Sequence, residues 1–273
     1  MKKKFQKPEV TIAHLTAELI TTNTKLKEAN EQLLKEKEIR NEMFANISHD
    51  LRSPITTIRN SIEYLLSLKN PETTILLEQL DPILTLMEKK IISLDSLIND
   101  IFILSSLENE TISFQIETIE IGMFLEDYFY SCVTDPKFNT RHLHLDVPID
   151  FAVSVHIDIL QMRRVLDNLF TNALKYSAPE DSITLGAYQK EQNVIIYLKD
   201  TGIGIPEEDL PKIFYRSYTV SKARTPGNNT SGTGLGLAIV KNIIQILNGS
   251  VCCQSQSGTG STFFISLPIV LKK

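Results

Sequence analysis

The stretch Phe44-Ala45-Asn46-Ile47-Ser48-His49-Asp50-Leu51-Arg52-Ser53-Pro54-Ile55-Thr56 lies inside a long run of helix-forming residues. Its apolar residues recur at helical spacing and continue beyond it: Phe44, Ile47, Leu51, Ile55, Ile58 and Ile62. At about 100° per residue, His49 lies roughly 200° around the helix from Ile47, with Ser53 about 40° further on. His49 therefore points away from the apolar stripe. Taken alone, such a histidine is more often an idle surface residue than a reacting group.

The size and charge of the chain limit the classes of protein to which it can belong. Its 273 residues are enough for two folded units and an extension. The net charge of -5 argues against a nucleic-acid binder, because phosphate contacts need a positive surface. No apolar run approaches the roughly 20 residues that a membrane-spanning helix needs. The three cysteines, Cys132 and the adjacent Cys252 and Cys253, lack metal-ligand spacing. We expect a reduced, cytoplasmic protein with no membrane span in this chain.

Residues 15–47 contain neither glycine nor proline and predict one long helix. One heptad seam consists of Leu19, Leu26, Leu33, Arg40 and Ile47. The second seam is poorer in large apolar residues: Leu15, Thr22, Ala29, Glu36 and Met43. The pattern favours a parallel coiled coil. A single amphipathic helix packed against its own chain is the alternative. We assign residues 1–39 to an N-terminal coiled-coil signalling helix.

The helical pattern continues through Pro54, which removes one backbone donor and is expected to kink or loosen the helix. It breaks at residues 69–71, and a second helical pattern covers residues 75–104. Two helices joined by a short loop form an antiparallel hairpin. Their apolar faces are wide for a single hairpin, so we expect two copies to pair as a four-helix bundle. Residues 40–110 are therefore predicted to be a dimerisation domain.

The hydrophobic period changes after about residue 110. Alternating apolar residues predict strands over residues 112–116, 143–147, 182–188, 194–199, 251–255 and 262–267. Helical patterns cover residues 121–132, 159–176 and 235–247. Residues 111–273 are thus predicted to form an α+β domain with helices on one face of a sheet. The expected fold class is multidomain: an all-α hairpin that dimerises into a four-helix bundle, followed by an α/β sandwich.

Two glycine-rich stretches are candidates for a ligand site. Asp200-Thr201-Gly202-Ile203-Gly204-Ile205-Pro206 directly follows a predicted strand. Glycines let backbone approach a ligand, and a carboxylate accepts from an amino group, although this stretch alone is an ordinary turn. Residues 231–240 place a glycine-rich loop at a helix start, which favours anion binding. The second stretch lacks the Gly-Lys-Ser/Thr of a Walker loop, and its glycine order differs from the dinucleotide-binding fingerprint.

Asn168, Asn172 and Lys175 lie on one side of a predicted helix that is otherwise largely apolar. Amide oxygens suit Mg²⁺, and an ammonium group suits a phosphate. The alternative is a solvated helix face without a ligand.

Taken together, these stretches resemble the transmitter region of a sensor histidine kinase of two-component systems. The phosphoacceptor box at residues 48–54, the asparagine box at 168–176, the Asp-x-Gly-x-Gly box at 200–204 and the Gly-Thr-Gly-Leu-Gly-Leu box at 232–237 stand in the family's order. The resemblance covers roughly residues 40–270. It implies a dimerisation and histidine phosphotransfer domain over residues 40–110 and a GHKL-type ATP-binding domain over residues 111–273.

The resemblance also implies roles for individual residues. His49 would accept the phosphoryl group of ATP, with Asp50 as base or orienting acid and Ser53 as a hydroxyl that could orient water. Asn172 would hold Mg²⁺ with Asn168 nearby, and Asp200 would read the adenine amino group. The implied nucleotide-binding residues are Asn168, Asn172, Lys175, Tyr176, Asp200, Gly202, Gly204, Ile205, Arg216, Gly232, Thr233, Gly234, Leu235, Gly236 and Leu237. A mobile lid is expected over residues 219–231.

Three positions depart from the family's pattern. Ser217 and Thr219 stand where a phenylalanine and an arginine are usual, which puts lid docking or a γ-phosphate contact in doubt unless Arg216 supplies it. Ser53 replaces the threonine or asparagine usual in phosphatase-competent members, so phosphatase activity is an open question.

The resemblance implies an ATP-dependent autokinase that uses ATP and Mg²⁺, acts as a homodimer and passes the phosphoryl group from His49 to an aspartate of a response-regulator receiver domain. Phosphatase activity toward that regulator is a further expectation. Two alternatives stay open at this point. One is a regulatory ATPase of the GHKL kind, which shares the nucleotide boxes but needs no phosphohistidine. The other is a dimeric scaffold that binds nucleotide without phosphotransfer.

Overall fold

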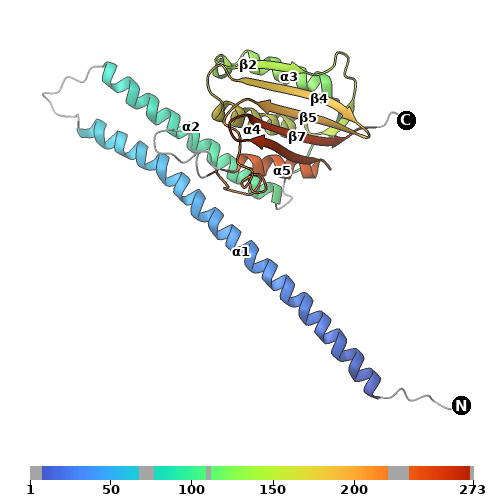
Figure 1. Ribbon diagram of the computed structural model, residues 1–273. Helices are drawn as coiled ribbons and strands as arrows, with labels where there is room; N and C mark the ends of the chain where they lie inside the picture. Colours follow the sequence, from blue (N-terminus) through green and yellow to red (C-terminus); the bar gives the residue numbers. More distant parts are fainter. Residues whose placement is uncertain (1–7, 68–76, 109–111, 221–233, 271–273) are drawn as a thin grey trace. The chain divides into compact units, whose positions relative to one another are not determined.

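The computed structural model describes residues 8–67, 77–108, 112–220 and 234–270 (Figure 1). It divides into two compact units, residues 1–50 and residues 51–273. Two long helices come first, α1 (Pro8–Ser67) and α2 (Leu77–Glu108). The predicted connection at residues 69–71 lies outside the described residues. Among the residues that are described, no helix has the length and apolar character needed to cross a bilayer.

The helix α1 runs through Pro54 without ending, although Pro54 cannot donate to the carbonyl of Asp50. A proline inside a helix loosens one turn, so the predicted weak point falls one turn after His49. The predicted helix over residues 15–47 is confirmed, and the element extends beyond it at both ends.

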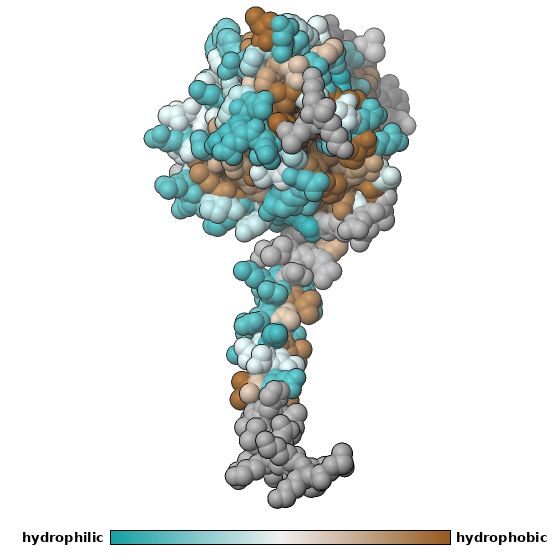
Figure 2. Space-filling model, turned by 90° about the vertical axis from the view of Figure 1, so that its right-hand side faces the viewer, coloured by the Kyte–Doolittle hydropathy of each residue, from teal (hydrophilic) through white to brown (hydrophobic). Residues whose placement is uncertain are grey.

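Both long helices carry large apolar side chains that are exposed in the single chain. Leu19, Leu26 and Leu33, which form the first heptad seam, are 62–68% exposed. In α2, Ile91, Ile98 and Phe102 are between 52% and 69% exposed. Figure 2 shows apolar residues among polar ones on the surface of α1, the rod-shaped lower part of that view. These helices therefore present apolar surface that the single chain does not bury.

The α/β part begins with β1 (Glu117–Glu120), α3 (Ile121–Val133) and a short 3₁₀ helix (Pro136–Phe138). These are followed by β2 (His142–Asp146), β3 (Ser154–Ile157), α4 (Ile159–Tyr176), β4 (Ser182–Lys190) and β5 (Asn193–Asp200). The last elements are α5 (Gly236–Ile246), β6 (Ser250–Gln256) and β7 (Gly260–Pro268). The expected α/β sandwich is confirmed.

One five-stranded sheet, in the order β2-β4-β5-β7-β6, forms one layer of the sandwich. The strand β2 is parallel to β4, and the other neighbouring pairs are antiparallel. The strands β1 and β3 form a separate antiparallel pair. The helices α3, α4 and α5 cover one face of the larger sheet (Figure 1). Leu185, Ile196, Leu198, Ile265, Leu166, Phe170, Ile239 and Ile243 belong to the core between the layers.

The predicted strand over residues 112–116 is wrong. These residues are irregular, and β1 begins only at Glu117. The backbone amide of Gln115 donates to the carboxylate of Asp158 (2.9 Å), so it pairs with a side chain and not with a strand. Ile112 and Phe114 are half-buried, but Ile116 is 47% exposed, so burial does not alternate along the whole stretch and a partner strand is not required. The four-residue strand β3 was missed because it is too short to show a clear period.

Candidate functional site

His49 lies on the solvent side of α1, with 81% of its side chain exposed. Its Nδ1 is 3.3 Å from Oδ1 of Asp50, whose side chain is 29% exposed. Adjacent residues on a helix do not face each other, so the rotamer of Asp50 makes this contact. In the tautomer with hydrogen on Nδ1, that nitrogen donates to Asp50. The lone pair of Nε2 is then available to a reacting group.

Ser53 lies one helical turn after His49 and is exposed. In the described part of the chain, its hydroxyl makes no hydrogen bond, unlike that of Ser48, which donates to the carbonyl of Phe44 (2.7 Å). The hydroxyl of Ser53 is thus available to a water molecule or an incoming group.

A cavity in the α/β part brings together three sequence motifs: the second half of α4, the turn after β5 and the start of α5. The predicted residues that line it are Asn168, Asn172, Lys175, Tyr176, Asp200, Gly204, Ile205, Gly234, Gly236 and Leu237. Gly202, Arg216 and Leu235 are described but do not line it. Gly232, Thr233 and most of the predicted lid lie outside the described residues. The motifs are far apart in the sequence, so this convergence is a result of the fold.

The helix α4 supplies the amide and ammonium groups of the cavity. The carboxylate of Asp158 caps its first turn by accepting from the amide of Gln161 (3.0 Å). Asn168 donates from Nδ2 to the carbonyl of Arg164 (3.0 Å), which leaves its Oδ1 as an acceptor. A Cβ added at Gly236 would lie only 2.5 Å from that oxygen, so a larger residue there would crowd Asn168.

Asn172 and Lys175 follow Asn168 on the same face of α4. Within the described residues, the side chain of Asn172 makes no hydrogen bond, so its amide oxygen is available to a ligand. The Nζ of Lys175 lies 4.8 Å from the centroid of the Tyr176 ring, within cation–π distance. Two amide oxygens beside an ammonium group fit Mg²⁺ and the phosphates that accompany it.

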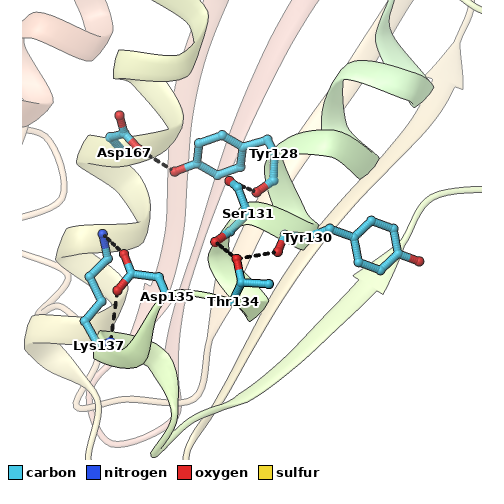
Figure 3. Close-up of polar contacts among 7 residues, drawn as sticks. All are labelled: Tyr128, Tyr130, Ser131, Thr134, Asp135, Lys137 and Asp167. Carbon is cyan, nitrogen blue, oxygen red and sulfur yellow. Dashed lines mark hydrogen bonds and ion pairs between the residues drawn. The ribbon is translucent and has the colours of Figure 1, made fainter.

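A buried tyrosine of α3 contacts α4 at the edge of the cavity (Figure 3). The hydroxyl of Tyr128 donates to Oδ1 of Asp167 (2.8 Å), which lines the cavity beside Asn168. Burial, followed by the charge of Asp167, raises the pKa of Tyr128 above its ordinary value. The hydroxyls of Ser131 and Thr134 donate back to backbone carbonyls at the end of α3. Sequence reasoning did not identify Tyr128, because an apolar face of α3 explains an aromatic residue equally well.

Asp200 is the buried carboxylate of the cavity, with 5% of the residue exposed. Its Oδ1 accepts from the backbone amides of Gly202 (2.9 Å) and Ser261 (3.3 Å). Burial raises the pKa of Asp200 above its ordinary value, and these two hydrogen bonds oppose that shift. Among the described residues Oδ2 has no hydrogen-bond donor, so it is the oxygen that can accept from a ligand amino group. Ser261 was missed by sequence reasoning, because only the pairing of β5 with β7 places it opposite Asp200.

The two glycines of the turn after β5 are required by packing. A Cβ at Gly202 would overlap the carbonyl oxygen of Tyr176, which accepts from the amide of Ile203 (3.0 Å). Gly204 has φ +68°, and a Cβ there would overlap the carbonyl of Gln256. The sequence suggested that these glycines let backbone approach a ligand. For Gly202 the structure gives a different reason, which is the contact between the turn and the end of α4.

The start of α5 lines the cavity through Gly234, Gly236 and Leu237. Gly234 has φ +67°, and its carbonyl accepts from the amide of Ser217 (3.0 Å). Leu235 is fully buried and anchors the first turn in the core. The first amides of a helix have no intrahelical acceptor, and they carry the positive end of the helix dipole. This end of α5 therefore suits an anion.

One wall of the cavity includes Tyr218 together with Thr219 and Val220, which are the described start of the predicted lid. The hydroxyl of Tyr218 donates to Oδ1 of Asp209 (2.5 Å), and this bond, more than burial, raises the pKa of Tyr218 to about 12. Ser217 has φ +56°. The buried hydroxyls of Ser217 and Thr219 have no hydrogen-bond partner in the described structure. The two departures from the family pattern thus put small polar groups where larger side chains are usual.

Comparison with protein families identifies two domains. Residues 39–110 match the His Kinase A (phospho-acceptor) domain. Residues 157–271 match the family described as histidine kinase-, DNA gyrase B-, and HSP90-like ATPase. The two matches contain the phosphoacceptor box and the three nucleotide boxes respectively.

Two curated relatives are sensor kinases named WalK. The chain is 35% identical over 237 residues to sensor histidine kinase WalK of Bacillus subtilis (strain 168), which covers 84% of this chain and 36% of that protein. It is 35% identical over 246 residues to sensor protein kinase WalK of Staphylococcus aureus, which covers 89% of this chain and 57% of that protein. The chain thus spans between about a third and somewhat over half of the length of these relatives.

Two solved structures share the fold. The Acinetobacter baumannii histidine kinase AdeS has a TM-score of 0.61 at 23% identity, covering 82% of this chain and 98% of that one. The histidine kinase ThkA, solved in complex with the response regulator protein TrrA, has a TM-score of 0.65 at 18% identity. That match covers 86% of this chain and 64% of ThkA. At these identities the likeness concerns the fold.

Proposed function

Because the chain belongs to the sensor histidine kinases of two-component systems, we propose that it is an ATP-dependent autokinase that phosphorylates His49. The observation that carries this proposal is the contact between His49 and Asp50, which occupies Nδ1 and leaves Nε2 exposed. A regulatory ATPase would have no need of such a group. The domain limits at residues 1–39, 40–110 and 111–273 are part of the proposal.

The reaction starts with Nε2 of His49 as the nucleophile. Its lone pair attacks the γ-phosphorus of ATP, a P–N bond forms, and the bond to the leaving oxygen of ADP breaks in line. The imidazole becomes positive as the P–N bond forms, and Asp50 beside Nδ1 stabilises that charge and takes the Nδ1 proton. Most of the rate enhancement comes from positioning the two groups and from electrostatic stabilisation.

The cavity of the α/β part is the proposed ATP site. Oδ2 of Asp200 accepts from the amino group of adenine, and Tyr176 packs beside the base. Lys175 and the amides at the start of α5 bind phosphate oxygens. Asn172, together with Asn168, holds Mg²⁺, which when bound neutralises part of the triphosphate charge. Neither Gly202 nor Leu235 lines the cavity. Gly202 acts by allowing the turn after β5 to pack against the end of α4, and Leu235 acts by anchoring the first turn of α5.

The proposal includes four further residues. Gly232 and Thr233 complete the glycine-rich loop, although they lie outside the described residues. Thr219 stands where the family usually has an arginine. Arg216, three residues earlier, supplies the γ-phosphate contact in its place. Ser53 orients water for hydrolysis of a phosphorylated regulator, because its hydroxyl has no partner on α1.

We propose that the protein works as a homodimer and passes its phosphoryl group to the aspartate of a response-regulator receiver domain. The exposed apolar side chains of α1 and α2 support a dimeric bundle, since burying each such side chain is worth about 1.5–3 kcal/mol. The complex of ThkA with a response regulator supports the proposed partner class. The use of ATP and the free Cys132, Cys252 and Cys253 support a cytoplasmic location.

The test is labelling with ATP that carries radioactive γ-phosphate. Wild type and the control His144→Gln, which changes an exposed histidine of β2, are expected to acquire label that is stable in alkali and lost in acid. His49→Gln is expected to acquire none. Equal acid-labile label on His49→Gln would refute the proposal. Steady ATP hydrolysis by His49→Gln at the wild-type rate, without label on either protein, would support a regulatory ATPase instead.

A further inference from the structure

Arg141 lies immediately before β2, and its guanidinium binds the end of α4. Its Nε donates to the hydroxyl of Ser177 (2.8 Å), and its Nη2 donates to the carbonyls of Ser177 (2.7 Å) and Leu174 (3.3 Å). Its Nη1 donates to the hydroxyl of Thr140 (2.7 Å), which orients the group from the other side. Ser177 is only 9% exposed, so this network is largely shielded from water.

This contact replaces the usual cap of the helix. The last carbonyls of a helix have no intrahelical donor and carry the negative end of its dipole. Many helices satisfy them with a glycine in a left-handed conformation. The helix α4 has no such glycine: Ser177 at its end has φ -107° and ψ 152°. The guanidinium supplies both the donors and the positive charge that this end needs.

The end of α4 is also held from a second direction. The carbonyl of Tyr176 accepts from the amide of Ile203, in the turn that carries Asp200. Arg141 holds the carbonyls on either side, those of Leu174 and Ser177. Lys175 and Tyr176, whose side chains line the cavity, therefore lie between two sets of hydrogen bonds.

We propose that Arg141 is a positioning residue for nucleotide binding. It does not line the cavity, so it would act without touching a nucleotide bound there. It acts through the backbone of α4, by holding Lys175 and Tyr176 in the orientation that binds phosphate and base. This inference rests on the proposed use of ATP by the cavity. A lysine cannot take the place of Arg141, because an ammonium group cannot reproduce the fork of three donor nitrogens that point to different acceptors.

The test compares Arg141→Lys and Arg141→Met with a matched control, Arg163→Met. Arg163 is a residue of α4 that forms an ion pair with Asp127 of α3, and it does not line the cavity. The dissociation constant of a non-hydrolysable ATP analogue is measured by titration calorimetry on the whole chain. The measurement is made well below the unfolding temperature of each variant, so that only folded protein is compared.

We expect Arg141→Lys to weaken nucleotide binding about tenfold, which corresponds to losing about one charge-assisted hydrogen bond. Arg141→Met should weaken it further, and Arg163→Met should stay within about twofold of wild type. In autophosphorylation, the KM for ATP should rise while kcat changes much less, because His49 is untouched. A purely structural role would instead lower the active fraction, and with it the apparent kcat, at constant KM.

An unchanged dissociation constant and KM for Arg141→Lys, with a lower melting temperature, would overturn the inference but leave the proposed function intact. If Arg141→Met does not fold, the lysine variant decides the matter alone. A wild-type chain that binds no ATP analogue would overturn both the inference and the proposed function.

Discussion

Asp200 is a buried carboxylate with different environments at its two oxygens. Oδ1 accepts two backbone amides, from Gly202 and Ser261, and Oδ2 is proposed to accept from adenine. The substitution Asp200→Asn keeps the size of the side chain and can keep its oxygen on the two amides. Its NH₂ group would then occupy the position of Oδ2 and face the amino group of adenine, so two donors would meet.

The expected loss of affinity follows from that change. A hydrogen bond to a charged group is worth about 1.5–3 kcal/mol, and every 1.4 kcal/mol is a factor of ten. Asp200→Asn should therefore weaken binding of an ATP analogue about 10- to 150-fold, measured by titration calorimetry. The control is Asp127→Asn, which removes a carboxylate from an exposed ion pair and should change affinity by less than twofold.

The same substitution should raise stability. Burial raises the pKa of Asp200, so the ionised form is disfavoured in the folded protein relative to the unfolded chain. This penalty is absent below the ordinary pKa of about 3.9 and develops as pH rises through the higher pKa of the folded state. Asp200→Asn removes the penalty. The melting temperature of the variant should exceed that of wild type at pH 7, and the difference should shrink toward pH 4.

Two results would refute this reasoning. Wild-type affinity in Asp200→Asn would mean that Oδ2 does not accept from the ligand. A variant that is less stable than wild type at pH 7, by a margin that does not change with pH, would mean that the charge of Asp200 is not the source of a folding penalty.

Two further predictions follow from packing and burial. Gly202→Ala should lower the free energy of unfolding in urea by about 2–4 kcal/mol, because its Cβ overlaps the carbonyl of Tyr176 and displaces a hydrogen bond. The control Gly258→Ala, whose Cβ meets nothing within 4 Å, should lower it only by the roughly 1–2 kcal/mol that a left-handed alanine costs. Equal losses in the two variants would contradict the overlap at Gly202. At pH 8, iodoacetamide should label the exposed Cys252 well before Cys253, because burial raises the pKa of Cys253 to about 12. Tandem mass spectrometry distinguishes the two sites, and equal labelling rates would contradict the burial of Cys253.

Regular elements with a strong period were the most predictable part of the fold. The helix over residues 159–176 was predicted with both ends correct, because its apolar residues keep a 3.6-residue period throughout. The strands β4 to β7 were placed within three residues of their observed ends, because alternation and turn residues agree there. The strand predicted at residues 112–116 was wrong, because an alternating apolar pattern does not report whether a partner strand is present, and the exposed Ile116 does not continue the pattern of burial.

The candidate site was predictable where a residue's chemistry is unusual for its place. Two asparagines and a lysine on one helix face, and glycines beside Asp200, stand out in a sequence without any knowledge of contacts. In the structure these stretches line one cavity. Tyr128, Arg141 and Ser261 could not be found this way, because a tyrosine, an arginine and a serine have no special meaning without their partners.

The chemical groups that the protein carries, and the order in which they occur, can be read from the sequence alone: an outward-facing histidine next to an aspartate, then amides, a carboxylate and glycines. Those features depend on local periods and on residue types, which can be read along the chain. Which of these groups contact each other depends on the folded structure. The carboxylate of Asp200 meets Ser261 through strand register, and Arg141 meets the end of α4 across 33 residues. Such contacts depend on how distant elements pack, and no local pattern in the chain records that packing.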